Sequence, residues 1–147
     1  MKKSCFLVIG LILAASSARA DDTSTNANLD MQFGTHAEFR KVFDALKAGV
    51  ARNDAAGLSK VVNYPLAVRT GGRKLTIKSS RAFIANYSAI MRPSIVKAIE
   101  NANYGELFVN YQGAMLGDGE VWIGSKCVDA ACSRSKIGVI TIQETQP

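Results

Sequence analysis

The sequence has a single histidine, His36, among its 147 residues. One histidine cannot build a histidine-rich metal site or a two-histidine nuclease site, and His36 is the sole candidate for a triad base. It stands at the start of the first expected helix, where a solvated role is favoured over a catalytic one. Beyond the N-terminus no apolar run approaches the ~18 residues of a membrane span. We therefore expect no metal, no cofactor and no stable membrane insertion.

Cysteines are few. Cys5 lies in an N-terminal apolar stretch, which leaves Cys127 and Cys132 in the segment Cys-Val-Asp-Ala-Ala-Cys. A redox or metal pair is the alternative, but the four-residue gap lacks the two-residue spacing of thioredoxin-like motifs and His36 is too isolated to complete a zinc set. The pattern favours a structural disulfide, as in exported proteins.

The first 20 residues have the layout of a secretory signal peptide. Lys2 and Lys3 precede an apolar stretch, and Ala18-Arg19-Ala20 is a small-x-small cleavage site. We predict cleavage after Ala20 and a periplasmic location. Of the 18 basic residues, three leave with this segment, so 15 basic and 12 acidic residues remain and the net charge falls from +6 to +3.

Acidic residues are absent between Asp54 and Glu100. Eight basic residues occupy that interval, and five of them fall around one turn and its strands: Arg69, Arg73, Lys74, Lys78 and Arg81. The pattern predicts a basic contact surface for an anionic envelope component or an acidic partner protein, and the alternative is an ordinary solvated face. No nucleic-acid recognition motif appears, so we expect no nucleic-acid partner.

Helical spacing predicts a first helix that begins with a capping box at Thr35 and Glu38. Its apolar face comprises Phe39, Val42, Phe43, Leu46 and Val50. Three shorter helices are expected: one capped by Asn53-Asp54 and ended by Tyr64-Pro65, one capped by Ser79 or Ser80 with an apolar face through Met91, and one with Pro93 in its first turn.

Strand patterns fill the rest of the chain. Short strands are expected at residues 66–68 and 74–78, followed by an extended run at 107–116, a turn at 117–119 and strands at 120–124 and 136–143. Helices followed by an antiparallel meander predict an α+β fold. We divide the chain into a signal peptide (1–20), a flexible leader (21–34) and a single domain (35–147).

This order of elements resembles the nuclear-transport-factor-two-like superfamily, and more narrowly small exported bacterial proteins within it. The likeness covers about residues 36–143 and is carried by residues 39–50, the Asn63-Tyr64-Pro65-Leu66 break, and residues 108–113 leading into 117–123. It implies a cone-shaped, curved antiparallel sheet wrapped by three to four N-terminal helices. It also implies a homodimer through the exposed sheet face. Members of the superfamily isomerise or dehydrate ligands, bind small molecules or bind proteins, so activity does not transfer with the fold.

A pocket inside such a cone would be lined by aromatic residues. The candidates are Tyr64, Tyr87, Tyr111 and Trp122, for which core or rim positions are the alternative. No acidic residue lies mid-strand with them, and Asp118 and Glu120 fall in or beside a turn, so no catalytic residue is assigned.

We therefore expect a non-enzymatic periplasmic protein that contacts a partner protein or an anionic envelope component through its basic surface. One alternative is a small-molecule-binding protein, or an isomerase- or dehydratase-like enzyme, that uses the cone interior. A second alternative is an immunity or inhibitor protein directed against a toxin.

Overall fold

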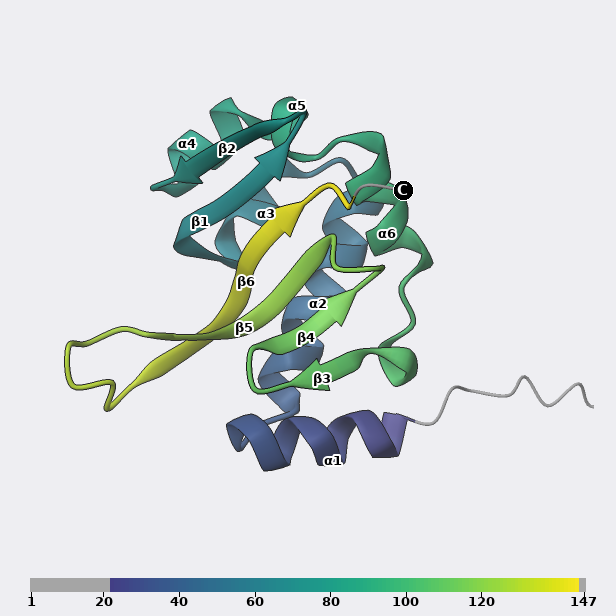
Figure 1. The fold of residues 1–147 in the computed structure, drawn as a ribbon, viewed down its shortest axis with the longest axis vertical. Helices are drawn as coiled ribbons and strands as arrows, with labels where there is room; N and C mark the ends of the chain where they lie inside the picture. Colours follow the sequence, from purple (N-terminus) through teal and green to yellow (C-terminus); the bar gives the residue numbers. More distant parts are fainter. Residues whose placement is uncertain (1–21, 146–147) are drawn as a thin grey trace, which may run out of the picture.

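The computed structural model describes residues 22–145 (Figure 1). The helices are α1 (Asp22–Phe33), α2 (Ala37–Ala51), α3 (Ala55–Lys60), α4 (Ser80–Ala85), α5 (Tyr87–Ile90), α6 (Pro93–Asn101) and the 3-10 turn η1 (Tyr104–Glu106). The strands are β1 (Val62–Thr70), β2 (Arg73–Ile77), β3 (Phe108–Asn110), β4 (Gly113–Leu116), β5 (Val121–Cys127) and β6 (Ser135–Gln143). In the described part of the chain no helix is both long and apolar enough to cross a membrane.

The strands form one six-stranded sheet in the order β2-β1-β6-β5-β4-β3. The meander from β3 to β6 is antiparallel, as predicted, and so is the β1–β2 hairpin. β1 and β6 run parallel, so the sheet is mixed rather than wholly antiparallel. The α+β class is therefore confirmed, with this correction to the strand directions.

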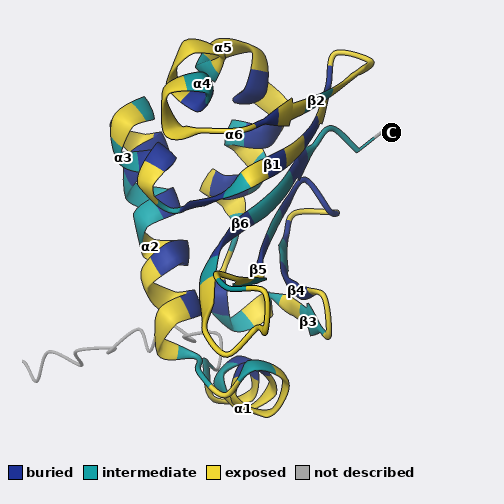
Figure 2. Ribbon diagram, turned by 90° about the vertical axis from the view of Figure 1, so that its left-hand side faces the viewer, coloured by how far each residue is buried: buried dark blue, intermediate teal, exposed yellow. Residues whose placement is uncertain are grey.

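The core lies between one face of the sheet and the helices. α2 packs on β5 and β6, and α6 packs on α2 and β5. Figure 2 shows α2 and α3 on one side of the sheet. All five residues of the predicted apolar face are buried: Phe39, Val42, Phe43, Leu46 and Val50. Each such side chain removed from water contributes about 1.5–3 kcal/mol before entropy costs.

Several predicted helix starts are confirmed by their hydrogen bonds. The side chain of Asp54 accepts from the N–H of Gly57 at 2.8 Å, and that of Ser79 accepts from Ala82 at 3.2 Å. Pro93 is the first residue of α6. The capping box is half formed, because Thr35 accepts from the N–H of Glu38 at 3.4 Å while the Glu38 carboxylate pairs with Lys41.

Residues 22–33 of the predicted flexible leader instead form α1. Its polar sequence has almost no apolar periodicity, but Leu29 is fully buried and Phe33 stacks on Phe39 with ring centroids 4.9 Å apart. The hydroxyl of Tyr104 donates to the Asn26 side chain at 2.9 Å. Tyr104 lies 78 positions from Asn26 in the sequence, so a local pattern does not reveal this contact.

The prediction that α3 continues to Tyr64-Pro65 is wrong. α3 ends at Lys60, and β1 runs through this dipeptide, whose peptide bond is cis. Proline lacks the N–H that a sheet ladder needs. Here the pairing of β1 with β6 is irregular between Val62 and Ala67, and Pro65 falls within that gap.

Two other predicted elements are divided in the structure. The run at 107–116 is the β3–β4 hairpin, in which the Asn110 side chain accepts from the N–H of Gln112 at 2.8 Å. The helix after Ser79 is split into α4 and α5 at Asn86, whose side chain donates back to the carbonyl of Ala82 at 2.8 Å. Ile84 in α4 is exposed, whereas Ile90 and Met91 are buried.

Candidate functional site

Three residues of the predicted basic surface line one pocket. The pocket has a volume of about 580 Å³ and is lined by Arg69, Gly72, Arg73, Lys74, Ser94, Glu144 and Thr145. We call it the basic pocket. Its walls come from the β1–β2 hairpin, the first turn of α6 and the segment that follows β6.

The hairpin explains why these cations gather. In the register of β1 with β2, Arg69 lies opposite Lys74 and Thr70 lies opposite Arg73. Gly71 and Gly72 have φ angles of +57° and +72°, a combination that a tight two-residue turn requires and glycine readily adopts.

The hairpin is also fixed to the helical layer. Thr70 is buried, and its hydroxyl donates to the carbonyl of Ala89 at 2.8 Å. This bond fixes the end of β1 next to the turn, so the pocket wall rests on a tertiary contact.

The charges of the pocket are unbalanced. Arg69 and Lys74 lie directly opposite each other on neighbouring strands. Like charges in this arrangement lower the stability of a sheet. Within residues 22–145, Arg69, Arg73 and Lys74 form no ion pair. A bound anion would relieve this repulsion.

One carboxylate, that of Glu144, lies in the basic pocket. It accepts from the Gly71 N–H at 2.5 Å, from Arg92 Nε at 2.7 Å and from Ser94 Oγ at 3.3 Å. The Gly71 hydrogen bond, followed by that of Arg92, lowers the pKa of Glu144 from its ordinary value. The Glu144 backbone N–H also donates to the Arg69 carbonyl at 2.8 Å.

The other two predicted basic residues lie elsewhere. Lys78 follows the end of β2 at Ile77, which pairs with Leu66 at the far end of the hairpin from the turn. Arg81 lies in the first turn of α4. Neither lines the basic pocket. The predicted surface is therefore divided between the two ends of the hairpin.

The four aromatic candidates are dispersed. The Tyr64 hydroxyl donates to the Ser59 carbonyl at 2.9 Å, and the Tyr87 ring packs against Phe83 with centroids 6.1 Å apart. Burial raises the pKa of both tyrosines. Tyr111 is 79% exposed at the β3–β4 turn. None of the three lines the basic pocket.

Trp122 lies on β5 between Val121 and Ile123, which are both fully buried. Successive side chains of a strand point to opposite faces, so Trp122 is on the sheet face away from α2. Its partners in the register are Met115 on β4 and Thr141 on β6. It does not line the basic pocket either.

A second hollow, of about 550 Å³, lies between α6, η1 and the β4–β5 turn. It includes none of the aromatic candidates, and no sequence pattern indicates it. Glu120 in its wall is nearly buried, and its carboxylate accepts from the Asp118 N–H at 2.6 Å and from the Thr145 hydroxyl. These bonds give Glu120 a structural role in the turn.

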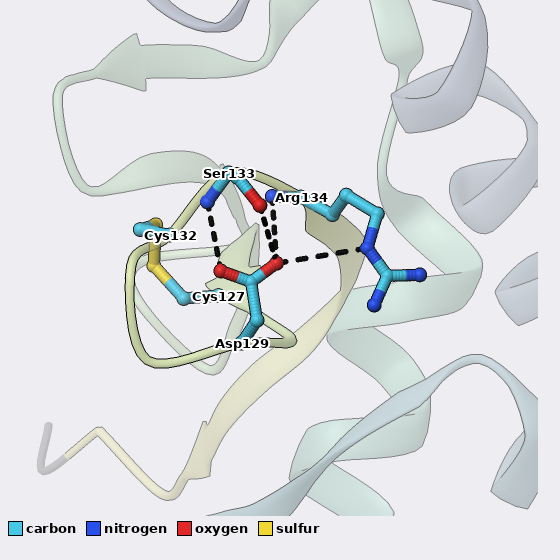
Figure 3. The surroundings of a disulfide bond; sticks show 5 residues. All are labelled: Cys127, Asp129, Cys132, Ser133 and Arg134. Carbon is cyan, nitrogen blue, oxygen red and sulfur yellow. Dashed lines mark hydrogen bonds and ion pairs between the residues drawn. A yellow bond between two sulfur atoms is a disulfide. The ribbon is translucent and has the colours of Figure 1, made fainter.

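The Cys127–Cys132 disulfide closes the tip of the β5–β6 hairpin, which extends away from the rest of the sheet (Figure 1). Figure 3 shows Asp129 inside this loop, where it accepts from the N–H groups of Ser133 and Arg134 at 2.9 and 3.0 Å. The Ser133 backbone bond is the main reason that the pKa of Asp129 is lowered. The predicted cysteine pair is therefore present as a disulfide, and it closes a hydrogen-bonded loop.

His36 stands at the N-cap of α2, with Nδ1 2.8 Å from Asp30 Oδ2. The hydrogen bond with this side chain is the largest cause of the lowered pKa of Asp30. His36 thus links α1 to α2 at the surface. Within the described residues, no group of three or more His, Cys, Asp or Glu side chains is arranged to hold a metal ion.

The chain is thus an α+β protein with a pocket lined by three cations at one end of its sheet. Compared with known proteins, the chain has no significant match among protein-family models, curated proteins or solved structures.

Proposed function

We propose that this protein is a non-enzymatic binding protein that holds an anionic group of a partner protein or an envelope component in the basic pocket. The observation that carries the proposal is the gathering of Arg69, Arg73 and Lys74 around one pocket without a paired carboxylate in the described chain. Cations at such a pocket attract anions over a distance of about 8 Å at physiological salt.

The proposed location is the periplasm. Disulfides form and persist in oxidising compartments, and the Cys127–Cys132 disulfide supports export. The signal peptide expected at residues 1–20 lies outside the described residues.

Membership of the nuclear-transport-factor-two-like superfamily, with its cone, is part of the same proposal. It is supported by the order of elements, in which α1 to α3 precede the first hairpin and α4 to α6 precede the antiparallel strands. The sheet face toward α2 is filled by buried side chains such as Val68, Ile123 and Ile142. No specific observation favours a ligand at that face, so we propose neither an enzyme nor a small-molecule carrier.

A charge-reversed variant tests the function. Arg69, Arg73 and Lys74 are changed together to Glu, and both proteins serve as bait in a periplasmic extract and in a binding assay with anionic vesicles. We expect the parent protein to retain a protein or to bind the vesicles, and the variant to lose that interaction.

The matched control reverses three basic residues outside the pocket: Lys60, Lys78 and Arg81. Each variant reverses three basic residues, so both carry the same total charge. The three control side chains are exposed, as are those of the pocket. Equal loss in the two variants would show a general charge effect, and retained binding in the pocket variant would remove the support for the proposal.

A further inference from the structure

Glu144 gives the basic pocket an occupant that belongs to the protein itself. Its carboxylate is held by a backbone N–H, a guanidinium and a hydroxyl that come from the β1–β2 turn, the residue before α6 and α6 itself. Gly71 and Glu144 are 73 positions apart in the sequence. The three donors therefore converge only in the folded chain, and they form a carboxylate cradle.

The cradle adjoins the three cations, because Ser94 and Glu144 belong both to the cradle and to the lining of the basic pocket. Glu144 forms an ion pair with Arg92, whereas Arg69, Arg73 and Lys74 line the same pocket without one in the described chain. Charge-assisted hydrogen bonds are about twice as strong as neutral ones. A ligand with several carboxylates would thus gain contacts that Glu144 alone cannot supply.

The main chain around Glu144 indicates the kind of ligand. The Glu144 N–H donates to the carbonyl of Arg69. Glu144 therefore makes two kinds of contact, one through its carboxylate in the cradle and one through its backbone along the end of β1. A peptide with acidic side chains reproduces both contacts, whereas a lipid phosphate or a free phosphate reproduces only the first.

We propose that Glu144 is an internal ligand of the basic pocket and that an acidic peptide segment of a partner protein displaces it. One carboxylate of the partner takes the position on Gly71, Arg92 and Ser94, and further carboxylates face Arg69, Arg73 and Lys74. This proposal rests on the proposed function of the pocket.

Glu144 and the acidic peptide compete for the carboxylate cradle, and this competition weakens binding of the partner. The partner binds the fraction of molecules in which Glu144 has left the cradle, so its apparent affinity is reduced by that fraction. Removing the charge of Glu144 weakens its hold on the three donors of the cradle and therefore tightens binding of the partner.

The test measures fluorescence anisotropy of a labelled tetraglutamate peptide at low salt. It compares the parent protein, Glu144→Gln and the control Glu106→Gln, which removes an exposed carboxylate in η1. We expect Glu144→Gln to lower Kd by on the order of tenfold and the control to stay within about twofold of the parent. A labelled tetraglutamine peptide should bind to none of them.

A second comparison tests the cradle itself. Arg92→Gln and Lys97→Gln are each added to Glu144→Gln; both replace an exposed cation of the α6 region, but of the two only Arg92 pairs with Glu144 in the described chain. We expect Arg92→Gln to abolish the gain in affinity and Lys97→Gln to preserve it. Thermal unfolding of each variant checks that it is folded.

The outcomes separate the two proposals. Equal Kd values for the parent and Glu144→Gln overturn the internal ligand, and the proposed function stands if the charge-reversed pocket still loses binding. A gain that Glu106→Gln shares, or that survives Arg92→Gln, also overturns it. Binding of anionic vesicles or inorganic phosphate without the peptide overturns the peptide ligand, and the absence of all binding overturns the function as well.

Discussion

At the scale of single residues, Leu29 is the fully buried apolar side chain of α1, whereas Met31 on the same helix is 77% exposed. Leu29→Ala should lower the free energy of unfolding by about 2–5 kcal/mol, because it removes buried methyl groups and leaves a cavity. Met31→Ala should change it by less than about 0.5 kcal/mol. Urea unfolding measures both, and equal effects would show that α1 does not stabilise the fold.

The candidate site shows how far single residues can be interpreted without a structure. The acid-free interval marks Arg69, Arg73 and Lys74 as unusual, and all three line the basic pocket. Nothing local marks Glu144, since its donor Gly71 lies 73 positions away in the sequence. A charge run can be recognised from sequence, but the carboxylate that lies beside it and pairs with Arg92 is brought there by tertiary structure.

At the scale of elements, the disulfide hairpin should stabilise the fold modestly. Closing a loop this short contributes about 2 kcal/mol on the chain-entropy estimate. Reduction should therefore lower the free energy of unfolding by about that amount, measured by urea unfolding with and without reductant. A Cys127→Ser/Cys132→Ser variant should start at the lower value and should not respond to reductant. A response in that variant would mean that the reductant acts elsewhere.

In the β3–β4 hairpin, substitution of Gly113 tests how closely β4 approaches β5. Its φ is +148°, and a Cβ there would clash with the Ile123 carbonyl oxygen on β5. Gly113→Ala should cost at least about 3 kcal/mol by strain and displacement of a central strand. Gly72→Ala, with φ +72° and open space around it, should cost about 1 kcal/mol. Similar losses in thermal unfolding would contradict the close approach of the two strands.

Elements differed in how well the sequence predicted them. α2 has a regular apolar face of five buried residues and is predicted almost to the residue. β1 was shortened in the prediction because Tyr64-Pro65 was interpreted as a break, although the irregular pairing with β6 accommodates the proline. Local patterns predict an element well when one face makes its packing contacts, as in α2. They fail when pairing with a distant strand accommodates a residue that locally indicates a break, as in β1.

At the scale of the whole molecule, stability should depend on pH through three carboxylates. The pKa values of Asp30, Asp129 and Glu144 are lowered from their ordinary values of 3.8, 3.8 and 4.5. The largest cause in each case is a hydrogen bond, formed with His36, Ser133 and Gly71 respectively. A group with a lowered native pKa binds fewer protons when folded, so acid favours the unfolded chain. The stabilisation is present above the ordinary values and is lost as the pH falls from about 5 through the native values.

A triple variant tests the origin of this acid sensitivity. Asp30→Asn, Asp129→Asn and Glu144→Gln together should lower stability at pH 7 and flatten its decline below pH 5, as measured by urea unfolding at a series of pH values. The matched triple changes Glu100, Glu106 and Asp118, whose carboxylates have no hydrogen bond or ion pair within residues 22–145, to their amides. It should keep the steep acid decline of the parent. The three carboxylates with lowered pKa values lie at the α1–α2 junction, in the disulfide loop and in the basic pocket. If the first triple variant lost stability below pH 5 as steeply as the parent, the contacts at these three places would not stabilise the folded molecule.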